Sequence, residues 1–123
     1  MEARSTERAL GDNWAEVRQR LGAWIVKIPA SSTAGFPDWL VLNVGIELWE
    51  AKRIRTGKTA YDPKQLSGAQ RFFIRMMARY LHADYPSGVL LLGEDGYLEV
   101  TAKRALRPMS AKAFHRNKEP YDG

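Results

Sequence analysis

Two carboxylates and a lysine are the residues of this sequence that could do chemistry together. Asp38 follows a proline, and Glu50 and Lys52 lie two positions apart near the end of a later β-rich run. Side chains two apart on a strand project to the same face, so Glu50 and Lys52 would lie side by side. Burying two acids in an apolar sheet is costly unless something compensates them, and a divalent cation suits such oxygen ligands. The plain alternative is a surface salt bridge between Glu50 and Lys52, which contributes little to stability.

A β-hairpin is the element that must bring Asp38 to the other two residues. The β-rich runs 38–44 and 46–52 are joined at Gly45, a pattern typical of a hairpin. The start of one hairpin strand lies across from the end of the other, and we expect Asp38 to pair with residue 51 or 52. Its carboxylate would then come close to Glu50.

The remaining segments predict an α/β or α+β domain. Short strands are expected at 23–28, 88–92 and 97–101, a polar loop at 53–63 and an amphipathic helix at 66–81. With a helix near the start of the chain, the order α-β-β-β-α-β-β gives a mixed sheet flanked by helices. We expect one domain over residues 1–106, followed by a loose basic tail over residues 107–123.

The start of the first helix has two solutions. Apolar spacing predicts a helix that ends at Gly22. It begins at residue 3 or restarts at residue 14, because Asn13 followed by Glu16 also forms a capping-box pattern. If the helix begins at residue 3, Glu7 lies on its apolar face together with Trp14.

Gln70 is a polar residue on a face that should point at the sheet. In the helix over 66–81 it lies among Phe73, Met77 and other apolar residues. An amide buried there needs a partner, and a glutamine satisfied within the core is the plain alternative. The four tryptophans alternate with apolar positions and are expected in the core or an interface.

Charge and composition narrow the class of partner. The chain has 123 residues, no cysteine and a net charge of +5, and residues 52–80 hold eight basic residues and one acidic residue. Such a block is typical of a surface that binds a polyanion, although a solvated basic surface is the alternative. The absence of cysteine excludes a disulfide framework, a cysteine nucleophile and a cysteine zinc site. No apolar run approaches the about 20 residues of a membrane span, so we expect a soluble, cytoplasmic protein.

The stretch G-F-P-D-W-L-V-L, followed by E-L-W-E-A-K, resembles the PD-(D/E)XK nuclease superfamily. Pro37-Asp38 is the first half of the motif, and Glu50-Ala51-Lys52 is the second. Within that superfamily the chain looks most like the VRR-NUC domains and the archaeal-type Holliday junction resolvases, many of them viral. Three further elements match these families: Glu7 fourteen residues before Leu21-Gly22, Lys27-x-Pro29-x-Ser31, and Leu66-Ser67-x-x-Gln70. The likeness covers residues 7–92, and Gly11-Asp12-Asn13 departs from it.

This resemblance implies a restriction-endonuclease-like core and a DNA endonuclease that depends on Mg²⁺, with Mn²⁺ able to substitute. Asp38, Glu50, the Ala51 carbonyl and Glu7 would hold the metal. Lys52 would orient the attacking water or stabilise developing charge, and Gln70 would position the lysine, the water or a phosphate. The residues expected to contact DNA are Ser31, Lys27, Arg53, Arg55, Lys58, Lys64, Arg71 and Arg75.

The implied partner is branched or junction DNA, with no membrane association and, if the protein is viral, a location in the host cytoplasm. Because a resolvase makes two symmetric incisions and this domain has one site, a homodimer is expected. Two alternatives stay open: a nuclease of the same fold that acts on flaps, nicks or a short sequence, and a non-catalytic DNA-binding module.

Overall fold

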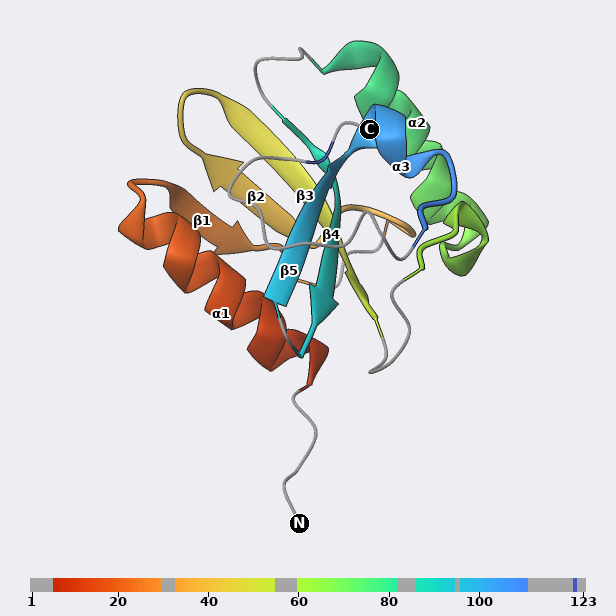
Figure 1. The fold of residues 1–123 in the computed structure, drawn as a ribbon. Coiled ribbons are helices and arrows are strands. Elements are labelled where there is room, and N and C mark those ends of the chain that lie inside the picture. The colour runs from red at the N-terminus through yellow and green to blue at the C-terminus, as the bar shows by residue number, and fades with distance from the viewer. Residues whose placement is uncertain are drawn as a thin grey trace.

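The computed structural model describes residues 6–29, 33–54, 60–81, 86–94, 96–110 and 121. Its elements, in chain order (Figure 1), are α1 (Glu7–Arg20), β1 (Trp24–Lys27), β2 (Trp39–Leu42), β3 (Ile46–Arg53), the 3₁₀ turn η1 (Pro63–Gln65), α2 (Gly68–Tyr80), β4 (Gly88–Gly93), β5 (Gly96–Thr101) and α3 (Ala102–Ala105). The expected strands and the two long helices are present in the expected order. The short helix α3 was not predicted.

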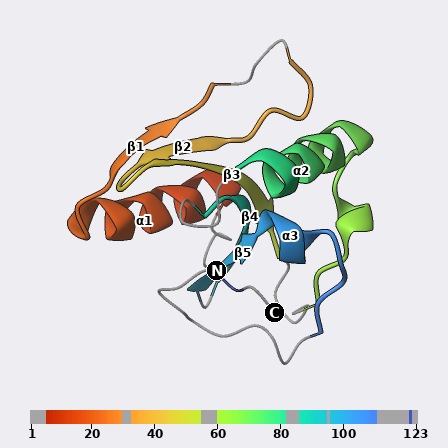
Figure 2. The same ribbon diagram turned by 90° about the horizontal axis from the view of Figure 1, so that it is seen from above.

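The strands form one mixed five-stranded sheet, so the described fold is of the α+β class. The strand order is β1-β2-β3-β4-β5, with β3 and β4 parallel and the other pairs antiparallel. The helix α1 packs on one face, and α2 and α3 pack on the other (Figure 2). Within the described residues no helix is long and apolar enough to cross a membrane, the longest being the 14 residues of α1.

The strand β4 is buried on both faces, as its unbroken apolar sequence predicts. Val89 and Leu91 pack into the core beneath α2 and α3, whereas Leu90 and Leu92 pack into the core beneath α1. Because successive strand residues point to opposite faces, one strand supplies both cores. The sheet is therefore fixed between two apolar layers, and β3 lies beside its most deeply buried strand.

The first helix, α1, is continuous and begins at Glu7, so it neither starts at residue 3 nor restarts at residue 14. Thr6 caps the helix, because its Oγ1 accepts a hydrogen bond from the backbone N–H of Ala9 at 3.0 Å. Gly11 does not break the helix, since it is buried against Trp39. A Cβ atom at Gly11 would lie 3.0 Å from the indole ring, so the glycine allows close packing of the helix on the sheet.

The capping box expected at Asn13 and Glu16 does not form. Asn13 lies exposed within α1, and Glu16 pairs with Arg20 one turn later. The end of the helix is as expected: Gly22 adopts a φ of 98°, a conformation that glycine tolerates best.

Three aromatic or apolar side chains attach the end of the chain and the expected 53–63 loop to the domain. Tyr61 is buried, its hydroxyl donates to the Ala105 carbonyl at 2.7 Å, and its backbone pairs with Met109. Met109 is itself buried, and Tyr121 pairs with Val100 of β5. Thus Tyr61, expected in a polar loop, and Met109 and Tyr121, expected in a loose tail, all pack onto the domain.

Candidate active site

The hairpin of β2 and β3 brings Asp38 next to Glu50. Trp39 lies opposite Trp49, and the Asp38 backbone N–H donates to the Trp49 carbonyl at 3.0 Å. Asp38 therefore lies across from Glu50 itself, and the expected pairing with residue 51 or 52 is wrong. The reason is that the turn is centred on Val44 and not on Gly45. The expected closeness of the two carboxyl groups is confirmed, since they interact directly.

Glu50 is an acid whose charge the protein compensates only in part. Its side chain is buried, and this burial, followed by the nearby Asp38 and Glu7 carboxyl groups, raises its pKa from 4.5 to about 8. One carboxyl oxygen, Oε1, accepts a hydrogen bond from Nε2 of Gln70 at 2.7 Å. The other, Oε2, is buried without a hydrogen-bond partner among the described residues. Perturbed, incompletely satisfied acids of this kind gather at functional sites.

Asp38 accepts a backbone hydrogen bond from β3 and forms an ion pair with Lys27 at the end of β1. Its Oδ2 accepts the backbone N–H of Ala51 at 2.8 Å, and its Oδ1 lies 3.3 Å from Nζ of Lys27. The Lys27 ammonium also lies 5.3 Å from the centre of the Trp39 ring, over its face. Lys27, which was expected to contact DNA, is therefore the lysine that lies beside Asp38.

Lys52 does not form the surface salt bridge with Glu50 that the plain alternative predicts. Its half-buried side chain forms no ion pair with Glu50 or with any other acid of the described segments. By strand alternation it projects to the same side of β3 as Glu50. The plain surface-salt-bridge interpretation is therefore wrong, and the lysine whose charge acts on Glu50 is Lys27.

The start of α2 aims Gln70 at Glu50. The Ser67 hydroxyl caps the helix, and Oε1 of Gln70 accepts the backbone N–H of Ser67 at 2.8 Å in a reciprocal capping box. This bond leaves the amide nitrogen directed at the acid. Gln70 is therefore satisfied by the capping box and the carboxyl group of Glu50, and it forms no hydrogen bond with a lysine of the described residues.

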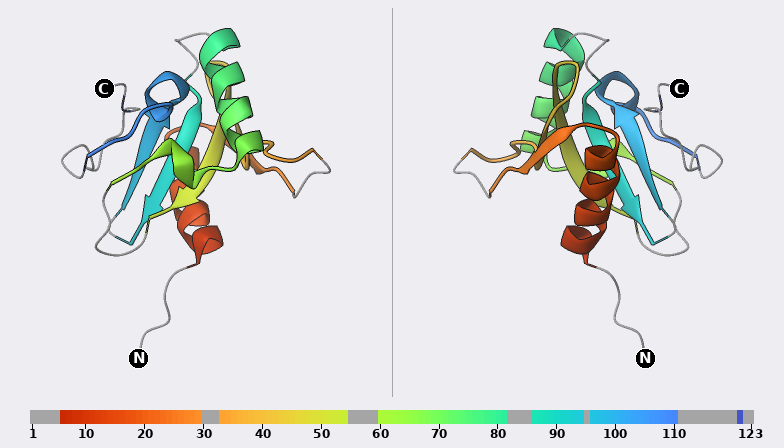
Figure 3. Two further views of the ribbon diagram at one scale, coloured as in Figure 1. Left: turned by 90° about the vertical axis from the view of Figure 1, so that its right-hand side faces the viewer. Right: turned by 90° about the vertical axis from the view of Figure 1, so that its left-hand side faces the viewer.

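A glycine locks the loop before Asp38 against the start of α2. Gly35 has a φ of +78°, and a Cβ atom there would lie 2.4 Å from the carbonyl carbon of Ala69. Only glycine permits this approach without a shift of the backbone. In Figure 3 (left) the chain leading to β2 passes beside the N-terminal end of α2. Asp38 and Gln70 are thus positioned by one contact between two segments.

Glu7 lies in the first turn of α1 and is exposed. Its charge contributes to the raised pKa of Glu50, which places it within electrostatic range of the pair. Within the described segments no cluster of three or more histidine, cysteine or acidic side chains is close enough to hold a metal. Mg²⁺, however, is commonly held by one or two carboxylates together with water and a substrate phosphate. The residues present, with the unpartnered Oε2 of Glu50, fit such a cation.

The other residues expected to bind DNA lie in different parts of the structure. Arg71, Arg75 and Arg79 recur every fourth residue along α2 and form one stripe, and Lys64 is exposed. Arg53 pairs with Glu94 at 2.7 Å, which partly neutralises its charge. The other three, Ser31, Arg55 and Lys58, lie outside the described residues.

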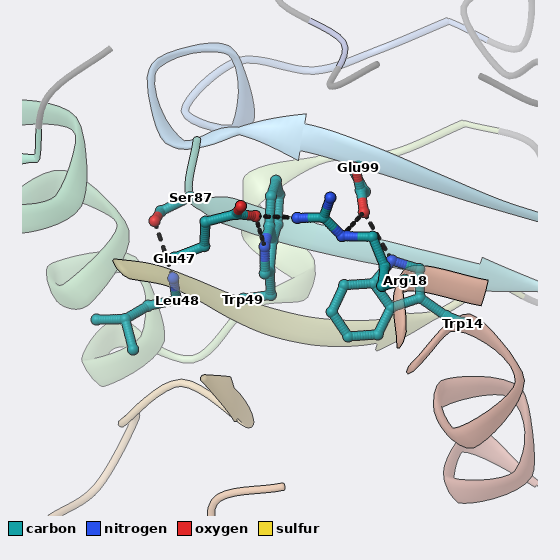
Figure 4. A network of polar contacts seen from close by, with 7 residues as sticks. All are labelled: Trp14, Arg18, Glu47, Leu48, Trp49, Ser87 and Glu99. Atoms are coloured by element: carbon teal, nitrogen blue, oxygen red, sulfur yellow. Dashed lines mark hydrogen bonds and ion pairs between the residues drawn. The ribbon is translucent and has the colours of Figure 1, made fainter. Parts of the chain in front are cut away.

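Sequence reasoning missed a second pair of buried acids, Glu47 and Glu99, on the α1 side of the sheet (Figure 4). Arg18 of α1 forms an ion pair with each of them. The indole N–H of Trp49 donates to Glu47 at 3.0 Å, and that of Trp14 donates to Glu99 at 2.7 Å. These acids therefore have charged and neutral donors within the core.

A signal for this cluster was present in the sequence. Trp14 and Arg18 are four residues apart and so share a helix face, and Glu47 alternates with Trp49 on the core side of its strand. An arginine directed at the core requires buried acids as partners.

The chain matches no protein-family model, and no curated protein is similar to it. The function is therefore inferred from the geometry of the site and the motif.

Proposed function

We propose that this protein is a Mg²⁺-dependent DNA endonuclease of the PD-(D/E)XK type, with a restriction-endonuclease-like core, that hydrolyses phosphodiester bonds in branched DNA. The observation that carries the proposal is the state of Glu50. It is buried beside a second acid, its pKa is about 8, and one of its oxygens has no hydrogen-bond partner in the described structure. A structural acid is normally satisfied by donors, and a cation is the compensator that oxygen ligands favour.

Asp38, Glu50 and the Ala51 carbonyl would hold the cation, with Glu7 helping directly or through water. When bound, a divalent cation neutralises charge on the phosphoryl group and lowers the pKa of a water molecule. To serve as a ligand Glu50 must lose its proton, which its hydrogen bond from Gln70 favours by stabilising one oxygen. The bond from the Ala51 N–H fixes the orientation of Asp38.

Lys27 and Lys52 would have different roles. Lys27 already contacts Asp38, so it balances charge and holds that carboxylate in place. Lys52 has no acidic partner within the described segments, so its ammonium is available to orient the attacking water or to stabilise charge that develops in the transition state.

DNA would be bound through its phosphates. The arginine stripe of α2 begins at Arg71, next to Gln70, and continues away from the acids. Such a row meets a phosphate backbone without reading sequence. Selectivity for a branched structure, and a homodimer that makes paired incisions, belong to the same proposal.

The experiment is one cleavage assay with a labelled four-way junction, a flap and a linear duplex, in Mg²⁺, Mn²⁺, Ca²⁺ or EDTA. We expect junction cleavage in Mg²⁺ and Mn²⁺, and binding without cleavage in Ca²⁺, whose looser coordination suits the transition state less well. Preferred cutting of the flap or the duplex would keep the chemistry and change the substrate. Cleavage undiminished in EDTA would contradict the metal site, and binding without cleavage in every metal would indicate a non-catalytic module.

A further inference from the structure

Three phenylalanine rings form a partly exposed cluster beside the start of α2. Phe36 lies edge-to-face with Phe73, with 5.5 Å between the ring centres, and Phe73 lies edge-to-face with Phe72 at 5.8 Å. Phe73 is half-buried and packs against the core. Phe36 and Phe72, at the two ends of the cluster, are 39% and 48% exposed. The middle ring thus anchors the cluster, and the two outer rings reach solvent.

The cluster lies next to the candidate active site. Phe36 comes two residues before Asp38, on the segment that passes beside the N-terminal end of α2 (Figure 3). Phe73 is three residues after Gln70, so the two side chains are neighbours on the helix surface, and Gln70 in turn donates to Glu50. A strand whose phosphate reaches the acids therefore passes close to these rings.

The arginine stripe of α2 runs alongside the cluster. Phe72 is three residues before Arg75 and seven before Arg79, a spacing that places all three on one side of the helix. Both arginines are exposed, and neither forms an ion pair with an acid of the described residues. This surface therefore combines a row of positive charge with exposed aromatic rings.

Single-stranded nucleic acid is the ligand that such a surface complements. Its phosphates are negatively charged, and its unpaired bases have exposed faces. Proteins that bind it combine a basic surface, which follows the backbone, with aromatic side chains on which the bases stack. A duplex offers the same phosphates, but its base faces are covered by the neighbouring base pairs. The exposed rings thus add a contact that only unpaired nucleotides can use.

We propose that Phe36 and Phe72 stack on unpaired bases of the DNA strand next to the scissile phosphate, while the arginine stripe binds the phosphates of that strand. This role rests on the proposed function, because Asp38 and Glu50 mark where the scissile phosphate lies. It narrows the substrate class to branched DNA that carries unpaired nucleotides at the branch. Phosphate contacts alone would not make this distinction.

Binding of short oligonucleotides, measured by fluorescence anisotropy in EDTA so that metal-dependent cleavage cannot occur, tests this role. The probes are a fluorescein-labelled single strand, the same strand with abasic sites in place of its central bases, and the corresponding duplex. We expect the wild type to bind the normal strand at least about 5-fold more tightly than the abasic strand, the low end of the contribution of one stacked base.

Phe72→Leu keeps an apolar side chain and removes the ring. It should weaken binding of the normal strand at least about 5-fold and leave binding of the abasic strand and the duplex unchanged, whereas Phe72→Trp should bind the normal strand as tightly as the wild type or more tightly. Arg75→Gln should weaken binding of all three probes alike, because it removes a phosphate contact.

Trp24→Ala is the matched control for the loss of an exposed aromatic ring. Trp24 is 59% exposed and begins β1, at the opposite end of that strand from Lys27, which contacts Asp38. This variant should bind all three probes like the wild type.

Equal binding of all probes by Phe72→Leu and the wild type, or equal weakening of the normal and abasic strands, would overturn the proposal. Binding of anionic lipid vesicles that requires Phe72, with no dependence of oligonucleotide binding on the bases, would do the same. Cleavage is measured separately. Base-dependent binding without cleavage in any metal would support the stacking role and contradict the nuclease, and cleavage without base-dependent binding would overturn the stacking role alone.

Discussion

The protein places two pairs of acids on opposite faces of one sheet, and their surroundings differ. Glu47 and Glu99 share an arginine and two indole donors. Asp38 and Glu50 lie side by side, and one oxygen of Glu50 has no partner among the described residues. The first pair thus has a buried cation and two neutral donors, whereas Glu50 receives, among the described donors, only the amide of Gln70. Under the proposed function, the first pair serves stability and the second serves the metal.

The largest effect expected from this comparison is on cleavage. Asp38→Asn and Glu50→Gln should each lower the rate by at least about 1,000-fold, since each removes a metal ligand, and should leave DNA affinity equal or higher because a charge that repels phosphate is lost. Glu16→Gln is the control, an exposed acid on α1 that pairs with Arg20 and should cut at the wild-type rate. Near wild-type cutting by Asp38→Asn would mean that the site lies elsewhere.

For the free energy of unfolding we expect the opposite order: a large loss when Arg18 is changed and little or no loss when Glu50 is changed. Arg18→Met leaves two buried carboxylates without their cation and should lower the free energy of unfolding by about 3–5 kcal/mol. Glu50→Gln removes an acid that is costly to ionise and should leave stability unchanged or raise it at pH 8. Urea denaturation of the two variants measures both values. Equal destabilisation by both would erase the distinction between the clusters.

A smaller effect, specific to the titration of Glu50, is expected in the pH dependence of stability. Because burial raises the pKa of Glu50 from 4.5 to about 8, the folded state keeps a proton that the unfolded state releases. Its stabilising contribution is full below about pH 4.5 and is lost as pH rises to about 8. Melting temperatures from pH 4 to 9 should therefore fall less steeply in Glu50→Gln than in the wild type. Identical slopes would place the titration in another group.

The smallest expected effect on cleavage is that of Gln70, and Gln65 provides the matched control. Both form capping boxes, Gln70 with Ser67 and Gln65 with Asp62, but only Gln70 also donates to Glu50. Gln70→Ala should slow cleavage about 10-fold at unchanged DNA affinity, whereas Gln65→Ala should lose only the cap and cut normally. An equal slowing of cleavage in both variants would assign the effect to helix capping.

Local pattern predicted most of the fold. The hairpin, the helix over 66–81 and the buried strand β4 each carry a periodicity strong enough to identify the element. The first helix was ambiguous because a glycine in a helix is usually a weakness, and only tertiary contact reveals that Gly11 faces Trp39. The positions of Met109 and Tyr121 likewise depend on long-range pairing, which no local pattern encodes.

The closeness of the two acids of the candidate site could be predicted from the sequence, but the contacts around them could not. The closeness of Asp38 and Glu50 follows from the hairpin, and an error in the turn shifted the register without separating them. The bond between Gln70 and Glu50 required the position of α2 over the sheet, and the place of Lys27 beside Asp38 required the β1–β2 pairing. Both depend on packing between elements distant in sequence, which spacing cannot supply.

The central claim is that Asp38 and Glu50 bind a divalent cation, and calorimetric titration of Mn²⁺ into the protein at pH 8, without DNA, tests it most directly. Wild type and Glu16→Gln should bind the metal with equal affinity, and Glu50→Gln should bind at least 10-fold more weakly. No binding to the wild type, or equal binding to Glu50→Gln, would contradict the claim.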